Sequence, residues 1–240
     1  MLSILTQALK LPFGHLLDHA VGHTCLLCRS DCRGQPLCPE CTADLPLPPP
    51  AHCPLCGEQT THGERCGACL KEAPHFDRAT AAFIYDFPVD RLIHALKYGH
   101  QLAIARWLAS CIAPGIRRDG QLIIPLPLHP ERLRERGFNQ SLEIAREIGK
   151  QLQLSVDPDA LARTRPTASQ AGLALKERHR NVKGAFECST DFTGRHILLI
   201  DDVMTSGATA NECARVLKLH GASEVSVAVA ARAQKGRSML

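Results

Sequence analysis

From Phe76 onward, short apolar runs alternate with stretches in which apolar residues recur every three or four positions. Runs of the first kind are typical of buried strands, and stretches of the second kind are typical of amphipathic helices. The pattern predicts strands at 80–85, 121–125, 196–201 and 224–230 and helices at 89–98, 102–112, 140–152 and 208–219. Strands that alternate with helices favour βαβ units. The expected fold class is therefore α/β, a mainly parallel sheet flanked by helices.

The first 75 residues lack this alternation. Leucines at helical spacing predict one N-terminal helix at 1–22, which Pro12 interrupts and which is too short to span a membrane. The opening stretch has no basic segment before its apolar residues, so we do not interpret it as a secretion signal. We expect a cytoplasmic protein with no membrane span. Three parts follow: the helix at 1–22, a cysteine-rich module at 23–75 and the α/β domain at 76–240.

The length of 240 residues allows one α/β domain of about 150 residues and a small appendage. A hydrophobic content of 45% and a charged content of 22% exclude a disordered or fibrous chain. The net charge of +4 comes from the larger domain, which has 23 Lys/Arg against 17 Asp/Glu, whereas the part up to Pro74 has 5 against 7. This surplus suits a polyanionic small molecule or a nucleic acid, although an ordinary solvated surface explains it equally well.

Twelve cysteines in a chain expected in a reducing compartment indicate metal binding rather than disulfides. Eight of them form a repeat: two C-x2-C pairs separated by nine residues recur 28 residues further along. Four thiolates at this spacing can close a tetrahedron around Zn²⁺. The sequence therefore predicts a double zinc ribbon with two structural Zn²⁺ ions, whose ligands are Cys25, Cys28, Cys38 and Cys41 for one and Cys53, Cys56, Cys66 and Cys69 for the other.

Some alternatives stay open for this module. An iron–sulfur cluster is the competing metal group, whereas catalytic zinc is disfavoured because four cysteines leave no open position. Cys32 has no counterpart in the repeat, since Thr60 stands there. We expect a free thiol at Cys32, with replacement of a ligand by Cys32, His23 or His52 as the alternative. The module has too few apolar residues for a core of its own, so metal binding, worth about 10–16 kcal/mol in zinc-finger peptides, must supply its folding energy.

The segment ILLIDDVMTSGAT at 197–209 carries the clearest chemistry. An apolar strand ends in two acids, and a loop of small residues then opens a helix. Ligands of open α/β sheets bind at the carboxyl ends of strands, and phosphates bind at helix N-termini. Gly207 allows a positive φ and a close approach of the backbone. Asp201 and Asp202 could accept hydrogen bonds from the two hydroxyls of a ribose. The spacing is not that of a Walker loop, and the alternative is a solvated Asp pair before an ordinary helix cap.

This segment resembles the 13-residue signature of type I phosphoribosyltransferases. The whole chain resembles the ComF competence-protein family, in a double zinc ribbon followed in order by AAFIYDFPVDRLIHALKYGH, IIPLPLHPERLRERGFNQS, RTRPTASQAGLALKERHRNVKGAF and HILLIDDVMTSGAT.

The resemblance implies a type I phosphoribosyltransferase-like domain that binds 5-phosphoribosyl 1-pyrophosphate (PRPP) with Mg²⁺. It implies Asp201 and Asp202 as catalytic residues. The residues that it implies for PRPP binding are Val203, Met204, Thr205, Ser206, Gly207, Ala208, Thr209, Arg132, Arg134, Arg136 and Arg178. Segment 125–139 is similar to the pyrophosphate-side loop, and segment 163–183, rich in basic residues, is similar to the lid that closes over the substrate. The basic residues of 132–136 could instead be a solvated turn, offset by Glu131 and Glu135.

The family association implies pentosyl transfer from PRPP in DNA uptake and natural transformation, with an acceptor that the residues do not identify. We find no general acid or base for a particular acceptor and no hood for a nucleobase. A non-catalytic module that senses PRPP, or one that handles single-stranded DNA, is the alternative. The partners left open beside PRPP are single-stranded DNA and a DNA-uptake helicase held through the zinc module.

Overall fold

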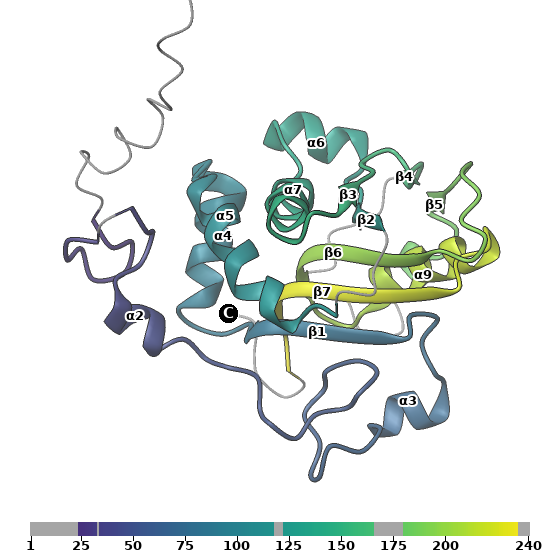
Figure 1. Cartoon of the computed structure of the whole chain (residues 1–240), viewed down its shortest axis with the longest axis horizontal. Coiled ribbons are helices and arrows are strands. Elements are labelled where there is room, and N and C mark those ends of the chain that lie inside the picture. The colour runs from purple at the N-terminus through teal and green to yellow at the C-terminus, as the bar shows by residue number, and fades with distance from the viewer. Residues whose placement is uncertain (1–23, 33, 118–121, 166–179, 235–240) are drawn as a thin grey trace, which may run out of the picture. The chain divides into compact units, whose positions relative to one another are not determined.

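The structure, a computed structural model, describes residues 24–32, 34–117, 122–165 and 180–234 (Figure 1). The chain divides into two compact units, Met1–Asp44 and Leu45–Leu240. The first unit contains the first four-cysteine group, and the second unit contains the second group together with the α/β domain. The N-terminal helix expected at 1–22 and the lid residue Arg178 lie outside the described residues.

The larger unit is built on a five-stranded, all-parallel sheet with the strand order β1-β7-β6-β2-β3 (Figure 1). A separate antiparallel pair consists of β4 and β5. The strands are β1 Arg78–Ile84, β2 Leu122–Pro125, β3 Ser155–Val156, β4 Ala162–Arg163, β5 Phe186–Glu187, β6 His196–Met204 and β7 Glu224–Arg232. The expected α/β class with a parallel sheet is confirmed.

Helices α4 Val89–Gly99, α5 Ala103–Ile112, α7 Gln140–Leu152 and α9 Ala208–Leu219 pack on this sheet, with a 3₁₀ turn η1 at Ala113–Gly115. The short helix α6 Pro130–Arg136 has no buried residue. Two short helices, α2 Pro39–Ala43 and α3 Gly67–Lys71, belong to the cysteine groups. Figure 1 shows α4, α5 and α7 together on one side of the sheet. On the other side, Cys213 and Leu217 of α9 share a buried cluster with Leu199 of β6.

Helix α7 shows how local sequence sets this packing. Its N-terminus is capped by Asn139, whose side chain accepts a hydrogen bond from the Ser141 N–H at 3.0 Å. Ile144 and Ile148 lie on its buried face, as their spacing predicts. A Cβ at Gly149 would come within 2.7 Å of Val156 in β3, so only glycine lets this strand approach the helix. At the other end of the helix, Gln140 and Ser141 in the first turn bond to Asp202 and Asp201 of β6.

Two differences from the sequence prediction matter for the site. Strand β6 continues to Met204, so Asp201 and Asp202 lie within the strand, and Asp201 is paired with Val229. The basic segment expected as a loop forms α6, because Pro130 at its first turn and two arginines in its last turn favour a helix. Strands β3, β4 and β5 were not predicted, since two residues are too few to show a periodic pattern.

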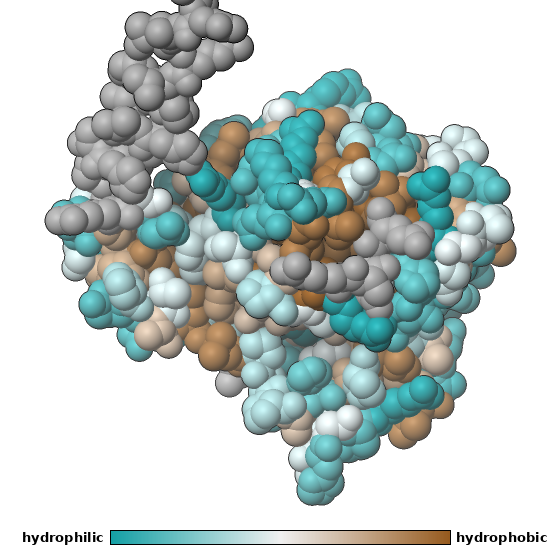
Figure 2. Space-filling model, viewed as in Figure 1, coloured by the Kyte–Doolittle hydropathy of each residue, from teal (hydrophilic) through white to brown (hydrophobic). Residues whose placement is uncertain are grey.

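The surface mixes polar and apolar residues. Figure 2 shows brown hydrophobic residues near the middle of the larger unit, framed by teal hydrophilic ones. Large apolar side chains that are exposed include Leu70 of α3 and Phe87 and Tyr98 beside and within α4. Within the described ranges, no helix combines the length and the apolar character needed to cross a membrane.

Candidate functional site

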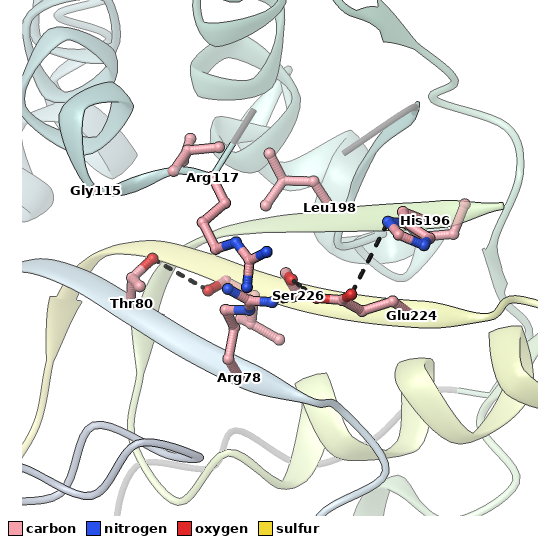
Figure 3. Close-up of a pocket in the computed structure, with 11 residues that line it drawn as sticks. Arg78, Thr80, Gly115, Arg117, His196, Leu198, Glu224 and Ser226 are labelled. Carbon is pink, nitrogen blue, oxygen red and sulfur yellow. Dashed lines mark hydrogen bonds and ion pairs between the residues drawn. The ribbon is translucent and has the colours of Figure 1, made fainter. Parts of the chain in front are cut away.

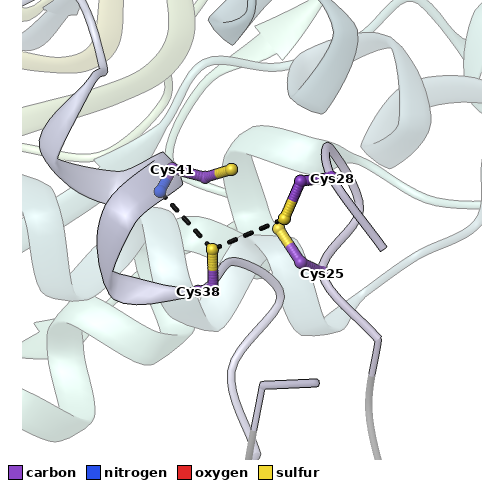
Figure 4. Close-up of side chains that lie close together, drawn as sticks. All are labelled: Cys25, Cys28, Cys38 and Cys41. Carbon is purple, nitrogen blue, oxygen red and sulfur yellow. Dashed lines mark hydrogen bonds between the residues drawn. The ribbon is translucent and has the colours of Figure 1, made fainter. Parts of the chain in front are cut away.

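Four thiols gather in the smaller unit, where Figure 4 shows Cys25, Cys28, Cys38 and Cys41 around a common centre. All four sulfur atoms lie within 4.8 Å of one another, and those of Cys28 and Cys38 are 3.6 Å apart. A disulfide would need about 2.05 Å. A tetrahedron with Zn–S bonds of about 2.3 Å has edges of about 3.8 Å. The spacing fits a metal ion and not a disulfide.

The larger unit repeats this arrangement with Cys53, Cys56, Cys66 and Cys69. Its four sulfur atoms also lie within 4.8 Å of one another, and those of Cys56 and Cys66 are 3.6 Å apart. The eight predicted cysteines thus form the two predicted groups, and each group could hold a zinc ion. Cys32 belongs to neither group, and its thiol donates to the Gln35 carbonyl oxygen at 3.0 Å.

The pKa values of the thiols in the second group also fit a bound cation. Burial opposes ionisation of Cys53, but backbone N–H groups, the strongest from Cys66, lower its pKa to about 7. Burial and the neighbouring Cys56 thiol raise the pKa of Cys69. Four adjacent thiols cannot all ionise by themselves, whereas Zn²⁺ holds its cysteine ligands as thiolates. The donor set therefore suits Zn²⁺.

Asp201 is the accessible acid at the end of β6. Its residue is half-buried, and it borders a hollow that the following loop completes, lined by Asp201, Val203, Met204, Thr205, Gly207, Ala208, Thr209, Ala210 and Val229. The Ser141 hydroxyl donates to Asp201 Oδ1 at 2.8 Å. Burial and the adjacent Asp202 carboxylate raise the pKa of Asp201 to about 7. A carboxylate here gains from any ligand that donates hydrogen bonds to its ionised form.

Asp202 is in a different environment. It is 3% exposed and forms an ion pair with the Lys97 ammonium of α4. The Gln140 amide nitrogen donates to its Oδ1 at 3.3 Å. Burial alone would raise the pKa of Asp202, but Lys97 and these hydrogen bonds outweigh it and lower the pKa. The pKa of Lys97 is raised, because the attraction of Asp202 exceeds the cost of burial. Asp202 is therefore held as a carboxylate inside the protein.

The arginines predicted to bind pyrophosphate lie on or at the end of α6. The Arg136 guanidinium donates to the Gln140 side-chain oxygen and lies 5.4 Å from the centre of the Tyr98 ring. It thus extends the Lys97–Asp202–Gln140 network toward the surface. Arg134 donates to the Pro130 carbonyl at 3.3 Å, and Arg132 makes a loose ion pair of 3.9 Å with Glu135. These last two contacts are exposed and of little energetic value.

The loop between β6 and α9 has the geometry of an anion cradle. Gly207 has φ +77° and directly precedes the twelve-residue helix α9. The Ser206 hydroxyl accepts from the Ala208 N–H at 3.2 Å. Backbone N–H groups at the start of a helix carry a partial positive charge and bind phosphate. Asp201, the loop and this helix end thus surround the same hollow.

Three side chains that contact the two acids are not among the residues predicted for the site. Lys97, Gln140 and Ser141 come from α4 and α7, far from the acids in the sequence. All three occur in the blocks that resemble the ComF family, HALKYGH and FNQS. Their chemistry could not be inferred without the sheet, because only the fold brings these helices to the end of β6.

A second hollow lies at the amino ends of the strands and is lined by charged side chains that contact one another. Figure 3 shows Glu224 at the start of β7 between Arg78 and His196. Glu224 forms an ion pair with Arg78, and its other oxygen lies 3.9 Å from His196. Ligands of parallel sheets bind at the carboxyl ends of strands. These contacts join β1, β7 and β6 at their amino ends, opposite the edge where a ligand is expected.

Comparisons with known proteins agree with the fold. Residues 139–239 match the family model of the phosphoribosyl transferase domain. The DNA utilization protein YhgH of Escherichia coli O157:H7 is 37% identical over 184 residues, which are 73% of this chain and 81% of that protein. Competence protein F of Haemophilus influenzae is 32% identical over 223 residues, 87% of this chain and 96% of that protein. The crystal structure of TT1426 from Thermus thermophilus is 16% identical with a TM-score of 0.32 and covers 56% of this chain and 83% of its own, a likeness too distant to add to the fold or the function.

Proposed function

Because the chain belongs to the ComF family of competence proteins, we propose that it binds PRPP with Mg²⁺ at the end of β6 and acts as a phosphoribosyltransferase-type protein in DNA uptake. The observation that carries the proposal is the hollow shared by Asp201, the Gly207 loop and the N-terminus of α9. A sugar phosphate needs both a hydroxyl acceptor and an anion site within one cavity. Asp201 supplies the first, and the loop N–H groups supply the second.

The two acids divide the work. Asp201 is half-buried and borders the hollow, so it is the carboxylate that accepts hydrogen bonds from the ribose hydroxyls. Asp202 forms an ion pair with Lys97 and accepts a hydrogen bond from Gln140, and these buried contacts hold the end of β6 in place. The negative charge of Asp202 also helps to raise the pKa of Asp201, because two adjacent carboxylates repel. Near neutral pH, Asp201 therefore ionises fully only when a ligand binds to it.

Pyrophosphate departure from PRPP leaves positive charge on the ribose carbon. Cationic groups near the leaving group stabilise its developing charge. Arg136 is the best placed of the three arginines of α6, since its contact with Gln140 joins it to the acid network. Arg132 and Arg134 lie on the exposed side of α6, and they can turn toward pyrophosphate at little cost. Arg178 completes the proposed set.

The donor set fits Mg²⁺ only as an ion that the substrate brings with it. One accessible carboxylate, Asp201, borders the hollow, and Mg²⁺ binds by one or two carboxylates together with water and phosphate oxygens. When bound, Mg²⁺ would neutralise pyrophosphate oxygens and improve the leaving group. The protein's own part is to orient the ribose, to hold the phosphate at the helix end and to exclude water.

We propose transferase activity ahead of the alternative, a module that senses PRPP without turnover. Release of pyrophosphate from PRPP, measured with a panel of nucleobases, amines and single-stranded DNA as acceptors, separates the two. Release that requires one of the acceptors and exceeds that of an Asp201→Asn variant supports transfer of the ribosyl group to that acceptor. Tight binding of PRPP with no release across the panel supports sensing.

The role in DNA uptake rests on the relatives named for competence and DNA utilization. Single-stranded DNA or a helicase held by the zinc module are the proposed partners, and the cytoplasm is the proposed location. The basic surplus of the larger domain suits a polyanion of either kind. Binding of a single-stranded oligonucleotide that weakens steeply with salt would support direct contact with DNA.

A further inference from the structure

Arg232 lies at the end of β7, where it is 5% exposed. In the sheet it pairs with Met204, the last residue of β6. Its guanidinium donates to the Met204 carbonyl at 3.2 Å and to the Thr205 carbonyl. These two carbonyls begin the loop that lines the proposed PRPP site. A buried guanidinium requires such acceptors, and it therefore fixes where the loop begins.

The opposite edge of the same guanidinium faces the second four-cysteine group. Arg232 Nε donates to the carbonyl of Cys56 at 3.0 Å, and Nη2 lies 3.0 Å from Glu58 Oε2. Cys56 belongs to the predicted ligands, and Glu58 follows it by two residues and is 7% exposed. One buried side chain thus bonds to the metal-binding turn and to the phosphate loop at once.

The position of Glu58 depends on the turn that carries the thiols. The Cys53 N–H donates to the Glu58 carbonyl at 2.7 Å, and the Gly57 N–H donates to the Cys53 carbonyl at 2.9 Å. Gly57 has φ +69°, which closes this turn. Such turns in small cysteine modules are ordered by metal binding, since little else holds them. Loss of the metal would therefore release the Glu58 carboxylate and the Cys56 carbonyl from Arg232.

A second connection reaches the same loop from the other side. The N–H of His75, which follows the cysteine group, donates to the Asn211 side chain at 2.6 Å. The Asn211 N–H in turn donates to the Gly207 carbonyl at 2.8 Å. The cysteine group therefore contacts the start of the loop directly, through Arg232, and the segment that follows the group contacts the first turn of α9, through Asn211.

We infer that the second four-cysteine group is a metal-dependent brace for the Met204–Gly207 loop, with Arg232 as the positioning residue that joins them. The inference rests on the proposed function only in identifying the ligand of the loop as PRPP. With metal bound, Arg232 holds the loop in its binding geometry. Without metal, the loop loses one side of its support, and affinity for the phosphate ligand falls.

The first test is hydrogen exchange of the loop amides at 203–210 in the full-length protein without ligand. Glu58→Gln removes the charge that pairs with Arg232, and Arg232→Lys keeps a positive charge but cannot bond both sides. Each should speed exchange of the loop by about tenfold. Glu64→Gln is the matched control, because Glu64 lies in the same ribbon and accepts only from Thr61 and His62 among the described contacts. A merely structural role would lower the melting temperature and leave loop exchange as in the control, and that result would overturn the inference.

The second test separates the metal sites. Cys66→Ser disrupts the second group and Cys38→Ser disrupts the equivalent position of the first. Loop exchange should rise about tenfold in Cys66→Ser alone. Titration calorimetry with PRPP and Mg²⁺ should show weakened binding in the same variant only. Equal effects of the two variants on loop exchange would also overturn the inference. Absence of PRPP binding in the unmodified protein contradicts the proposed function instead, and loop exchange still decides whether the brace exists.

Discussion

The Lys97 ammonium forms an ion pair with the buried Asp202 carboxylate, and this joins the end of α4 to the end of β6. Asp201, the preceding residue of the strand, contacts Ser141 instead and borders the hollow. Two adjacent acids thus lie in different electrostatic surroundings, which shift their pKa values in opposite directions. The separation supports the proposed roles, in which Asp201 contacts the ligand and Asp202 positions the site.

The ion pair predicts the effect of Lys97→Met. The change leaves Asp202 charged and buried without its cation, so unfolding free energy should fall by about 3–5 kcal/mol near neutral pH. The loss should shrink toward pH 5, because an unpaired buried carboxyl takes up a proton readily. Urea unfolding at two pH values measures this. Lys150→Met, which removes an exposed lysine paired with Glu147, should change stability by less than about 0.5 kcal/mol. Equal losses for both variants would contradict a special role for Lys97.

The raised pKa of Asp201 predicts how stability varies with pH. The native carboxyl, with its pKa of about 7, holds a proton that the unfolded chain releases near pH 4. Its contribution to stability therefore falls as pH rises from about 4 to about 7. Asp201→Asn cannot ionise, so it should melt at a higher temperature than the unmodified protein at pH 8, with the difference vanishing near pH 4. Thermal melts across this range decide the matter, and a difference that grows toward low pH would be the opposite of the expectation.

The cysteine groups predict the metal content. Elemental analysis should find about two Zn²⁺ per chain, and Cys38→Ser and Cys66→Ser should each lose one, since three thiolates cannot close the tetrahedron. Cys32→Ser should retain both, because its thiol lies outside the two groups. Full metal content in Cys66→Ser would move the ligand assignment to another residue.

The loop geometry predicts the effect of Gly207→Ala. A Cβ at Gly207 would meet Met204 Sδ at 3.6 Å, an ordinary contact, so the cost arises from the positive φ rather than from a clash. We expect a loss of about 1–2 kcal/mol in stability together with weaker PRPP binding. Gly115→Ala, at an exposed position without a positive φ, should be close to neutral. The two variants are compared by denaturant unfolding and by PRPP titration. A neutral Gly207→Ala would show that the loop does not need this conformation.

Much of the fold could be predicted from the sequence. The helices at 140–152 and 208–219 have the bounds that periodicity predicts, because each has an apolar face that the sheet buries. The eight cysteines were equally clear, since a repeated spacing reports a shared geometry directly. Helix α6 was missed because seven residues with one apolar position give no periodic signal.

The contacts that tune the site could not be predicted. Lys97, Gln140 and Arg232 reach β6 or its loop from α4, α7 and β7, and such contacts depend on the order of strands and the hand of each crossover. The adjacent acids in the sequence suggested that both face the ligand. Their opposite environments follow from the alternation of side chains along a strand, which became relevant once β6 was found to continue through both of them.

The most direct test of the proposed function is the affinity for PRPP in the presence of Mg²⁺, measured by titration calorimetry for the unmodified protein and for Asp201→Asn. A charge-assisted hydrogen bond to a ribose hydroxyl is worth about 1.5–3 kcal/mol, so the variant should bind about 10- to 100-fold more weakly. The exposed Asp159 provides the control, and Asp159→Asn should bind as the unmodified protein does. Equal affinity in a folded Asp201→Asn protein, or no binding by the unmodified protein, would contradict the assignment of the site at the end of β6.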